Sequence, residues 1–425
     1  MSIKSKSSEL LNNKTTDYRF IPFIVVACYI LTLLFSEYYF GTYAVVGDFF
    51  AIHPQPYFVD LKILLCGIDA IRDNISPYTV NCDDTFPHFN YPITWGFLAP
   101  LPFITASNFL YIGFALTLSL FTFLYFFIGR INFLEAIMYS VLFISPAVML
   151  GAERGNSDLI IFLLLLIPVF KSASKKLFTF IILFCSMLKL FPIGTIIGIF
   201  HNLKNNTKNS LILFFSTGLI FLLYIIIMKD NILMVSQKTP RPYRDFCYGL
   251  GGIPSIFIDH FLSGKIYIQI FLPVLMIIGF FLFYKLLGKQ FQTLKLSEDK
   301  YGLSYMVGSS IFITTCLIGY NWEYRLIFLL FTIPQTLRWF FEKKQLALFL
   351  LLLTMLLLWR SFIESILLKL PFNSHYSLIS QFFVVILFYG HLSILINFIK
   401  KTLNQIQPLF FIRKKHEVKY SNTSI

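Results

Sequence analysis

Charged residues are scarce in this sequence. They make up 13% of its 425 residues, whereas 57% of the residues are hydrophobic and 18% are aromatic. Soluble domains contain about 45–50% apolar and about 25% charged residues. Apolar runs of roughly 17–25 residues recur along the chain, the length that a helix needs to cross a bilayer, and no ten-residue alternation typical of a barrel is present. We therefore predict an all-α, polytopic helical membrane protein that forms one integral-membrane domain over residues 1–425.

Several common kinds of site are also missing. The six cysteines show no zinc spacing, the seven histidines are scattered singly, and Asp83 and Asp84 beside His88 form too weak a cluster to predict an ion site. No glycine-rich phosphate loop and no separate nucleotide-binding domain are present. We expect no metal, no cofactor and no cytoplasmic nucleotide sugar as substrate.

The positions of the cysteines allow one possible disulfide. Cys28, Cys185 and Cys316 lie in apolar runs and are expected to be packing residues. Cys82 and Cys247 each lie in a long polar loop. If both loops are extracytoplasmic, a disulfide between these two cysteines is one possibility.

The net charge of +14 comes from Lys and Arg in short segments between apolar runs. This pattern is typical of cytoplasmic loops and does not imply nucleic acid. We predict that residues 1–19 and the basic tail 400–425 are cytoplasmic, and that the protein is multi-pass in the cell (inner) membrane.

The apolar runs predict about eleven spans, within a range of nine to thirteen. They lie at about 20–40, 107–128, 133–150, 159–170, 178–200, 210–228, 266–287, 302–318, 323–341, 345–360 and 376–398. Residues 91–104 carry three prolines and would make only about 21 Å of helix, so a broken or re-entrant segment is expected there. Two large outer loops, 41–90 and 229–265, complete the predicted topology.

The first loop concentrates charge beside lipid-soluble sequence. Its segment 58–72 predicts an amphipathic surface helix with Phe58, Leu61, Leu65, Ile68 and Ile71 on one side. Asp60 lies at the start of this helix. A carboxylate held near apolar surface is suited to act as a general base, although an exposed loop carboxylate or a helix cap explains Asp60 equally well.

A second polar segment, GAERGNSD (151–158), interrupts two apolar runs. Its Glu153, Arg154, Asn156 and Asp158 are candidate substrate-binding residues: Arg154 suits a phosphate, Asn156 a helix cap and Asp158 a hydroxyl. The alternative is an internal Glu–Arg pair with a capped helix. Basic residues that flank this region place it on the side of the first loop, provided that 91–104 is not a full span.

The remaining candidate residues are Lys189, Arg241, Glu323 and Arg325. Lys189 supplies a point charge for phosphate, either at the turn of two half-helices near Pro192 or by snorkelling from one straight span. Glu323 and Arg325 open an apolar run and also fit simple pairing. Charge near a bilayer costs about 2.5–3.5 kcal/mol per residue, so such residues usually mark function or pairing.

Taken in order, these motifs resemble glycosyltransferase family 87 (domain of unknown function 2029), a group of the GT-C superfamily. The resemblance covers most of residues 45–335 and rests on Asp60, NISPY (74–78), FNYP (89–92), ERGNSDL (153–159), LKLFP (188–192) and NWEYRLIFL (321–329). ERGN with LKLFP is also similar to segments of GPI mannosyltransferase I. NISPY lacks the glycine usual before PY, and FNYPI has one proline where the family often has two.

The resemblance implies a GT-C-like hexosyltransferase, mannosyltransferase-like, that transfers sugar from a polyprenyl-phosphate donor to a glycan or glycolipid hydroxyl outside the membrane. It implies Asp60 as the base, with Asp48 as the competing match. Inversion is expected, with Arg154, Lys189 and Arg325 or Arg241 stabilising the departing phosphate. Such an enzyme would build an envelope glycan.

Two other functions stay open. A flippase or transporter of a lipid-linked saccharide would also place cations at a polar cavity, but it should show inverted repeats, and only one LKLFP-type break is present. An envelope polysaccharide polymerase or ligase would depend more on Arg241 and Arg244 than on Asp60.

Overall fold

The computed structural model describes residues 16–40, 57–82, 88–170, 174–201, 207–239, 247–249, 267–318, 321–367 and 376–421. These residues are almost entirely helical. The predicted all-α class is thus confirmed for this part of the chain, apart from one short antiparallel pair of strands, in which Cys247 faces Trp322 and Tyr248 faces Asn321.

The elements follow one another along the chain. The first eleven are α2 (Phe20–Phe40), α4 (Val59–Arg72), η1 (Ile93–Leu98), η2 (Ala106–Asn108), α5 (Phe109–Ile128), α6 (Phe133–Phe143), α7 (Pro146–Arg154), α8 (Ser157–Phe170), α9 (Lys175–Leu188), η3 (Phe191–Phe200) and α10 (Thr207–Ile227). The others are α11 (Lys229–Lys238), β1 (Cys247–Tyr248), α13 (Tyr267–Phe291), α14 (Lys300–Ile318), β2 (Asn321–Trp322), η6 (Glu323–Thr332), α15 (Ile333–Phe341), α16 (Gln345–Leu358), α17 (Arg360–Leu367) and α18 (Tyr376–Ser421).

Several helices are suited to a membrane. Among the described residues, five are long and apolar enough to cross one: Ala106–Ile128, Thr207–Ile227, Val274–Phe291, Lys300–Ile318 and Ile379–Asn404. Two bent pairs, α6 with α7 at 53° and α16 with α17 at 65°, raise this number to seven if each pair is one span. The length and the apolar composition of these helices are those of a helical membrane protein. The number is below the eleven predicted because apolar runs such as those in α8 and η3 form helices of only 14 and 10 residues.

The turn after α9 distinguishes two interpretations of LKLFP. α9 ends at Leu188, Lys189 has extended backbone, and η3 begins at Phe191 with Pro192 in its first turn and packs back against α9. The interpretation of one straight span is therefore wrong. The chain reverses at Lys189, as a proline after the break favours.

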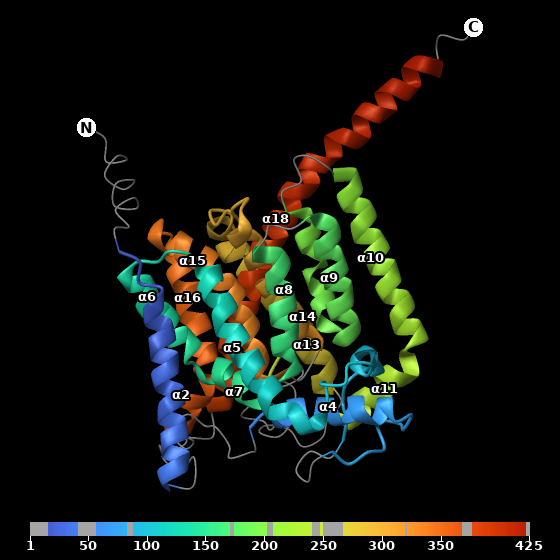
Figure 1. The fold of residues 1–425 in the computed structure, drawn as a ribbon. Helices are drawn as coiled ribbons and strands as arrows, with labels where there is room; N and C mark the ends of the chain where they lie inside the picture. The colour runs from blue at the N-terminus through green and yellow to red at the C-terminus, as the bar shows by residue number, and fades with distance from the viewer. Residues whose placement is uncertain are drawn as a thin grey trace.

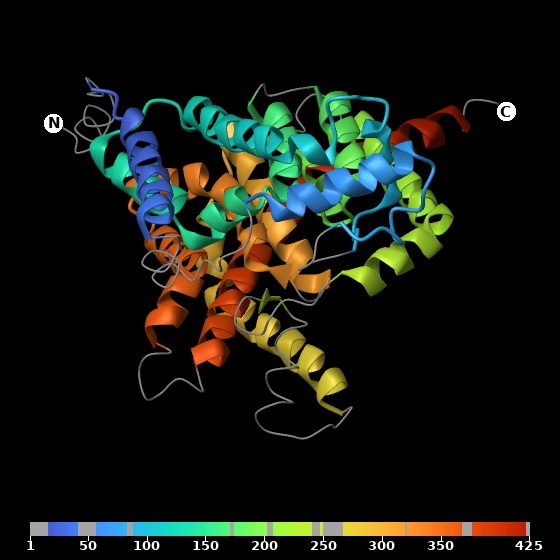
Figure 2. The same ribbon diagram turned by 60° about the horizontal axis from the view of Figure 1, so that its bottom comes forward.

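The two ends of the helix bundle differ. α2 begins and α18 ends at one end, whereas α4 and α11 lie across the opposite end (Figure 1). In Figure 2, where this end is turned toward the viewer, α4 runs across it. The predicted helix 58–72 is α4, but Leu61, Leu65 and Ile68 are buried within the protein. We call the end that carries α4 the α4 end.

Candidate functional site

The start of α4 is held against the turn between α7 and α8. The Phe58 amide donates a 2.7 Å hydrogen bond to the carbonyl oxygen of Glu153, and Phe58 has left-handed backbone with φ of 56°. A bulky residue in this region is rare and costs about 1–3 kcal/mol, which the surrounding packing has to offset. This junction places Asp60 in the first turn of α4, beside Arg154.

Gly155 allows the two segments to approach. It ends α7 with φ of 58°, and a Cβ added to it would lie 3.1 Å from both Leu61 Cβ and Phe58 Cδ1. Glycine adopts this conformation without steric cost and leaves room for α4. The ERGN motif therefore has glycine at position 155 because both the left-handed backbone at the end of α7 and the close approach of α4 disfavour a side chain there.

Asp60 is the centre of a buried hydrogen-bond network. Its Oδ1 accepts from Arg154 Nη2 at 2.5 Å, and its Oδ2 accepts from Arg154 Nε at 2.9 Å and from Asn156 Nδ2 at 2.5 Å. The first loop and GAERGNSD thus meet, as predicted. A carboxylate has about four acceptor positions, so the described residues leave one position on Oδ1 open to a substrate hydroxyl.

A second carboxylate lies behind the first. Asp158 accepts from Lys189 Nζ at 2.5 Å and from Arg325 Nε at 3.3 Å, and it is 1% exposed. Asn156 joins the two carboxylates: its Oδ1 accepts from the Asp158 amide at 2.9 Å, which confirms the predicted helix cap, and from Lys189 Nζ at 3.2 Å. Four segments far apart in sequence therefore form one connected network.

These groups surround a cavity of about 390 Å³ at the α4 end, which we call the cationic cavity. Its lining residues are Asp60, Ile63, His88, Asn90, Tyr91, Arg154, Asn156, Lys189, Val235, Lys238, Thr239, Trp322, Tyr324 and Arg325. Four of them are Lys or Arg, and Asp60 is the one acidic residue among these described lining residues. The wall is therefore positively charged and fits a phosphate-bearing molecule.

Aromatic rings support the cations. The guanidinium of Arg154 lies 5.8 Å from the Trp322 ring centroid, and Lys189 Nζ lies 5.6 Å from that of Tyr91. Each contact contributes about 0.5–1 kcal/mol or more where water is excluded. The network and the rings together hold these side chains in place before any substrate binds.

Hydrogen bonds position the wall that carries His88, Asn90 and Tyr91. The Tyr78 hydroxyl donates to the Tyr91 carbonyl oxygen at 3.0 Å and accepts from Asn231 Nδ2 of α11 at 2.8 Å. Burial raises the pKa of Tyr78, and the bond from Asn231 opposes this increase. Tyr78 is therefore neutral and serves to join α11 to the wall.

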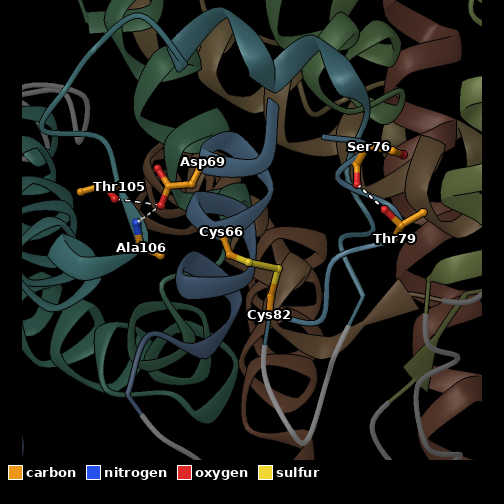
Figure 3. Close-up of a disulfide and its surroundings, with 7 residues drawn as sticks. All are labelled: Cys66, Asp69, Ser76, Thr79, Cys82, Thr105 and Ala106. Atoms are coloured by element: carbon orange, nitrogen blue, oxygen red, sulfur yellow. Dashed lines mark hydrogen bonds between the residues drawn. A yellow bond between two sulfur atoms is a disulfide. The ribbon is translucent and has the colours of Figure 1, made fainter. Parts of the chain in front are cut away.

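A disulfide fastens the same wall to α4. Cys66, on α4, is bonded to Cys82, and Figure 3 shows the pair close to Asp69. Asp69 Oδ2 accepts from Thr105 Oγ1 and from the Ala106 amide, each at 2.8 Å, and so connects α4 with the start of η2, the short helix before α5. The possible pairing of Cys82 with Cys247 is wrong, because Cys82 is bonded to Cys66, and Cys247 lies in β1 opposite Trp322.

The other candidate residues from the sequence are not among the described lining residues of the cationic cavity. Glu323 is absent from the described cavity wall, since its carboxylate accepts from Ser361 Oγ at 2.5 Å and from the Ser361 amide at 3.2 Å. Glu153 is absent from that wall as well, and its main-chain oxygen holds Phe58. Asp48 and Arg241 lie outside the described residues.

Sequence reasoning did not select nine of the described lining residues, among them His88, Lys238, Trp322 and Tyr324. Lys238 ends α11, whose approach to α4 depends on the fold. Trp322 ends β2, whereas Tyr324 lies in the first turn of η6, so the local period changes within NWEYR and no simple alternation selects these two residues. In the described part of the chain no group of three metal-ligating side chains occurs.

In comparisons with known proteins, no family model matches this chain, and no match is found among curated proteins or solved structures.

Proposed function

We propose that the protein is a membrane glycosyltransferase that transfers a hexose from a polyprenyl-phosphate donor to a hydroxyl of a glycan or lipid-linked acceptor. The observation that carries this proposal is the cationic cavity, whose described wall has four cations around one carboxylate, and the described residues leave an acceptor position open on that carboxylate. The resemblance of the motifs to glycosyltransferase family 87 suggests the same chemistry. Lipid-phosphate and hydroxyl substrates need these two kinds of group.

In the proposed reaction, the acceptor oxygen attacks the anomeric carbon while Asp60 takes the hydroxyl proton. The bond between the anomeric carbon and the phosphate oxygen breaks, and its electron pair leaves with the polyprenyl phosphate. Arg154, Lys189 and Arg325 would balance the charge that develops on this phosphate. Attack opposite the leaving group inverts the anomeric configuration.

The connected network suggests a further role for the acids. Asp158 holds Lys189 and Arg325 by ion pairs of 2.5 and 3.3 Å. Preorganised cations stabilise developing charge without rearranging during the reaction. Asp158 would thus position the cations rather than contact the sugar.

A hydrocarbon chain also has a place to bind. An apolar groove of about 510 Å³ lies between α2 and α5, and its lining includes Phe114 and Thr117. The Phe114 ring contacts the Phe58 ring, and the two ring centroids lie 5.2 Å apart. Phe58 precedes Asp60 by two residues. A lipid chain in this groove would therefore end near the cationic cavity.

The disulfide supports an extracytoplasmic reaction. Structural disulfides persist mainly in oxidising compartments, and Cys66–Cys82 lies at the α4 end with the cavity. The opposite end, where α2 begins and α18 ends, would then be cytoplasmic in the cell membrane.

The test is transfer of labelled sugar from synthetic polyprenyl-phosphate mannose or glucose to membrane glycolipids by the purified protein. Asp60→Asn should lower the transfer rate by about 10²–10⁴ while keeping donor binding, because a general base contributes that factor. Asp73→Asn is the matched control: it removes the same charge at the exposed end of the same helix. Equal activity of Asp60→Asn and wild type would exclude Asp60 as base, and translocation of donor without transfer would favour a flippase.

A further inference from the structure

A second cavity lies at the end of the bundle opposite to α4, away from the proposed catalytic groups. It has a volume of about 110 Å³ and is lined by Phe200, His201, Gln292, Leu294, Lys295, Leu296, Ser297, Glu298, Ile394, Asn397, Phe398, Lys401 and Thr402. A water needs roughly 10–15 Å³ on such a measure, so a phosphate-sized group fits. We call it the headgroup cavity.

Three segments build this cavity and hold it rigidly. The loop between α13 and α14 forms one wall, the end of η3 another, and α18 the third. Trp339 Nε1 donates to the Lys295 carbonyl oxygen at 2.9 Å, and Ser297 Oγ donates to Gln335 Oε1 at 2.6 Å. His201 Nε2 donates to the Ser297 carbonyl oxygen at 2.9 Å. The loop is thus fixed by buried side chains.

The charges of the lining favour an anion. Lys295 and Lys401 contribute positive charge, and Glu298 is the acidic residue among the described lining residues. The neighbouring Asp299 is paired with Arg338 at 2.8 Å, which balances its charge. The lining is therefore cationic overall, and His201, Gln292 and Thr402 add neutral hydrogen-bonding groups.

Asn397 adds a donor whose orientation is fixed. Lys400 Nζ donates to the Tyr284 hydroxyl at 3.1 Å, and this hydroxyl donates to Asn397 Oδ1 at 2.6 Å. Within the described residues, the buried Asn397 Nδ2 has no acceptor. An amide donor left without an acceptor costs about 1–3 kcal/mol, and an anion bound beside Asn397 in the cavity would supply that acceptor.

We propose that the headgroup cavity binds a phosphate group, as carried by an anionic phospholipid of the surrounding leaflet. Basic pockets between membrane-spanning helices bind such headgroups. Ile394 and Phe398, one turn apart on α18, supply apolar surface beside the lysines for the first part of the acyl chains. This site does not depend on the proposed glycosyl transfer.

The experiment measures binding of short-chain phosphatidylglycerol to the purified full-length protein in neutral detergent by isothermal titration. We expect saturable binding that Lys401→Gln and Lys295→Gln each weaken by about fivefold, which corresponds to one lysine near a headgroup. Lys289→Gln is the matched control, because Lys289 is exposed in the last turn of the neighbouring α13 and does not line the cavity. It should change the dissociation constant by less than twofold.

Two further arms identify the source of the phosphate. Inorganic phosphate that binds as tightly, with the same dependence on Lys401, supports the site but indicates a soluble ligand. Equal weakening by Lys289→Gln, no effect of Lys401→Gln in a folded protein, or equally tight binding of short-chain phosphatidylcholine would overturn the proposal. Asp60→Asn should bind the lipid like wild type, so failure of the catalytic proposal leaves this one testable.

Discussion

Gly155 offers the strictest test of the junction between α4 and α7. Replacing it with alanine keeps a small side chain but meets two costs. Left-handed backbone costs a non-glycine residue about 1–2 kcal/mol, and the new Cβ would lie 3.1 Å from Leu61 Cβ and Phe58 Cδ1, which forces these neighbours to shift. Overpacking of this kind adds about 1 kcal/mol or more. We expect Gly155→Ala to lower the free energy of unfolding by about 2–3 kcal/mol.

The assay is reversible unfolding of the purified protein in mixed micelles, followed by tryptophan fluorescence. Gly218→Ala is the control: Gly218 lies in α10 with φ outside the left-handed region and no heavy atom within 4 Å of an added Cβ. Alanine should stabilise that helix by up to about 1 kcal/mol. If Gly155→Ala is as stable as Gly218→Ala, the described junction is incorrect.

Three further predictions concern the cavity wall, the disulfide and pH. Lys238→Gln should weaken binding of farnesyl phosphate by about fivefold without changing stability, because it removes one partly screened positive charge. If a binding titration shows unchanged affinity, Lys238 does not belong to the site. Cys66→Ser should lower the free energy of unfolding by about 3 kcal/mol, because the bridge closes a loop with a sequence separation of 16, and a reductant should destabilise wild type but not this variant. Burial lowers the pKa of His201 from its usual 6.5, so the unfolded state binds more protons below pH 6.5 and stability falls as the pH decreases below that value. His201→Asn should flatten this part of the stability profile, and an unchanged slope would contradict the assignment.

Local sequence determined the class of fold and the elements that interact with near neighbours. Hydrophobic composition alone required helices, since backbone groups in lipid must be paired within one segment. The period of apolar residues located α4, and Asn156 before Ser157 located the start of α8. These features depend on contacts within a few residues, which a linear pattern records.

Sequence also selected much of the cationic cavity. Asp60, Arg154, Asn156, Lys189 and Arg325 stood out because charge beside apolar runs is costly unless it is paired or used, and all five line the cavity. It did not determine which residues pair. Glu323 follows the same pattern but bonds Ser361 instead, because it begins η6 with its side chain toward α17.

Only the tertiary structure decided the partners that come from distant segments. The reversal at Lys189 brings its ammonium to Asp158, the approach of α11 adds Lys238, and the fold of the first loop pairs Cys82 with Cys66. The headgroup cavity likewise joins η3, the loop before α14 and α18. Such sites form where packing of whole helices brings side chains together, and neither hydropathy nor spacing along the chain contains that geometry.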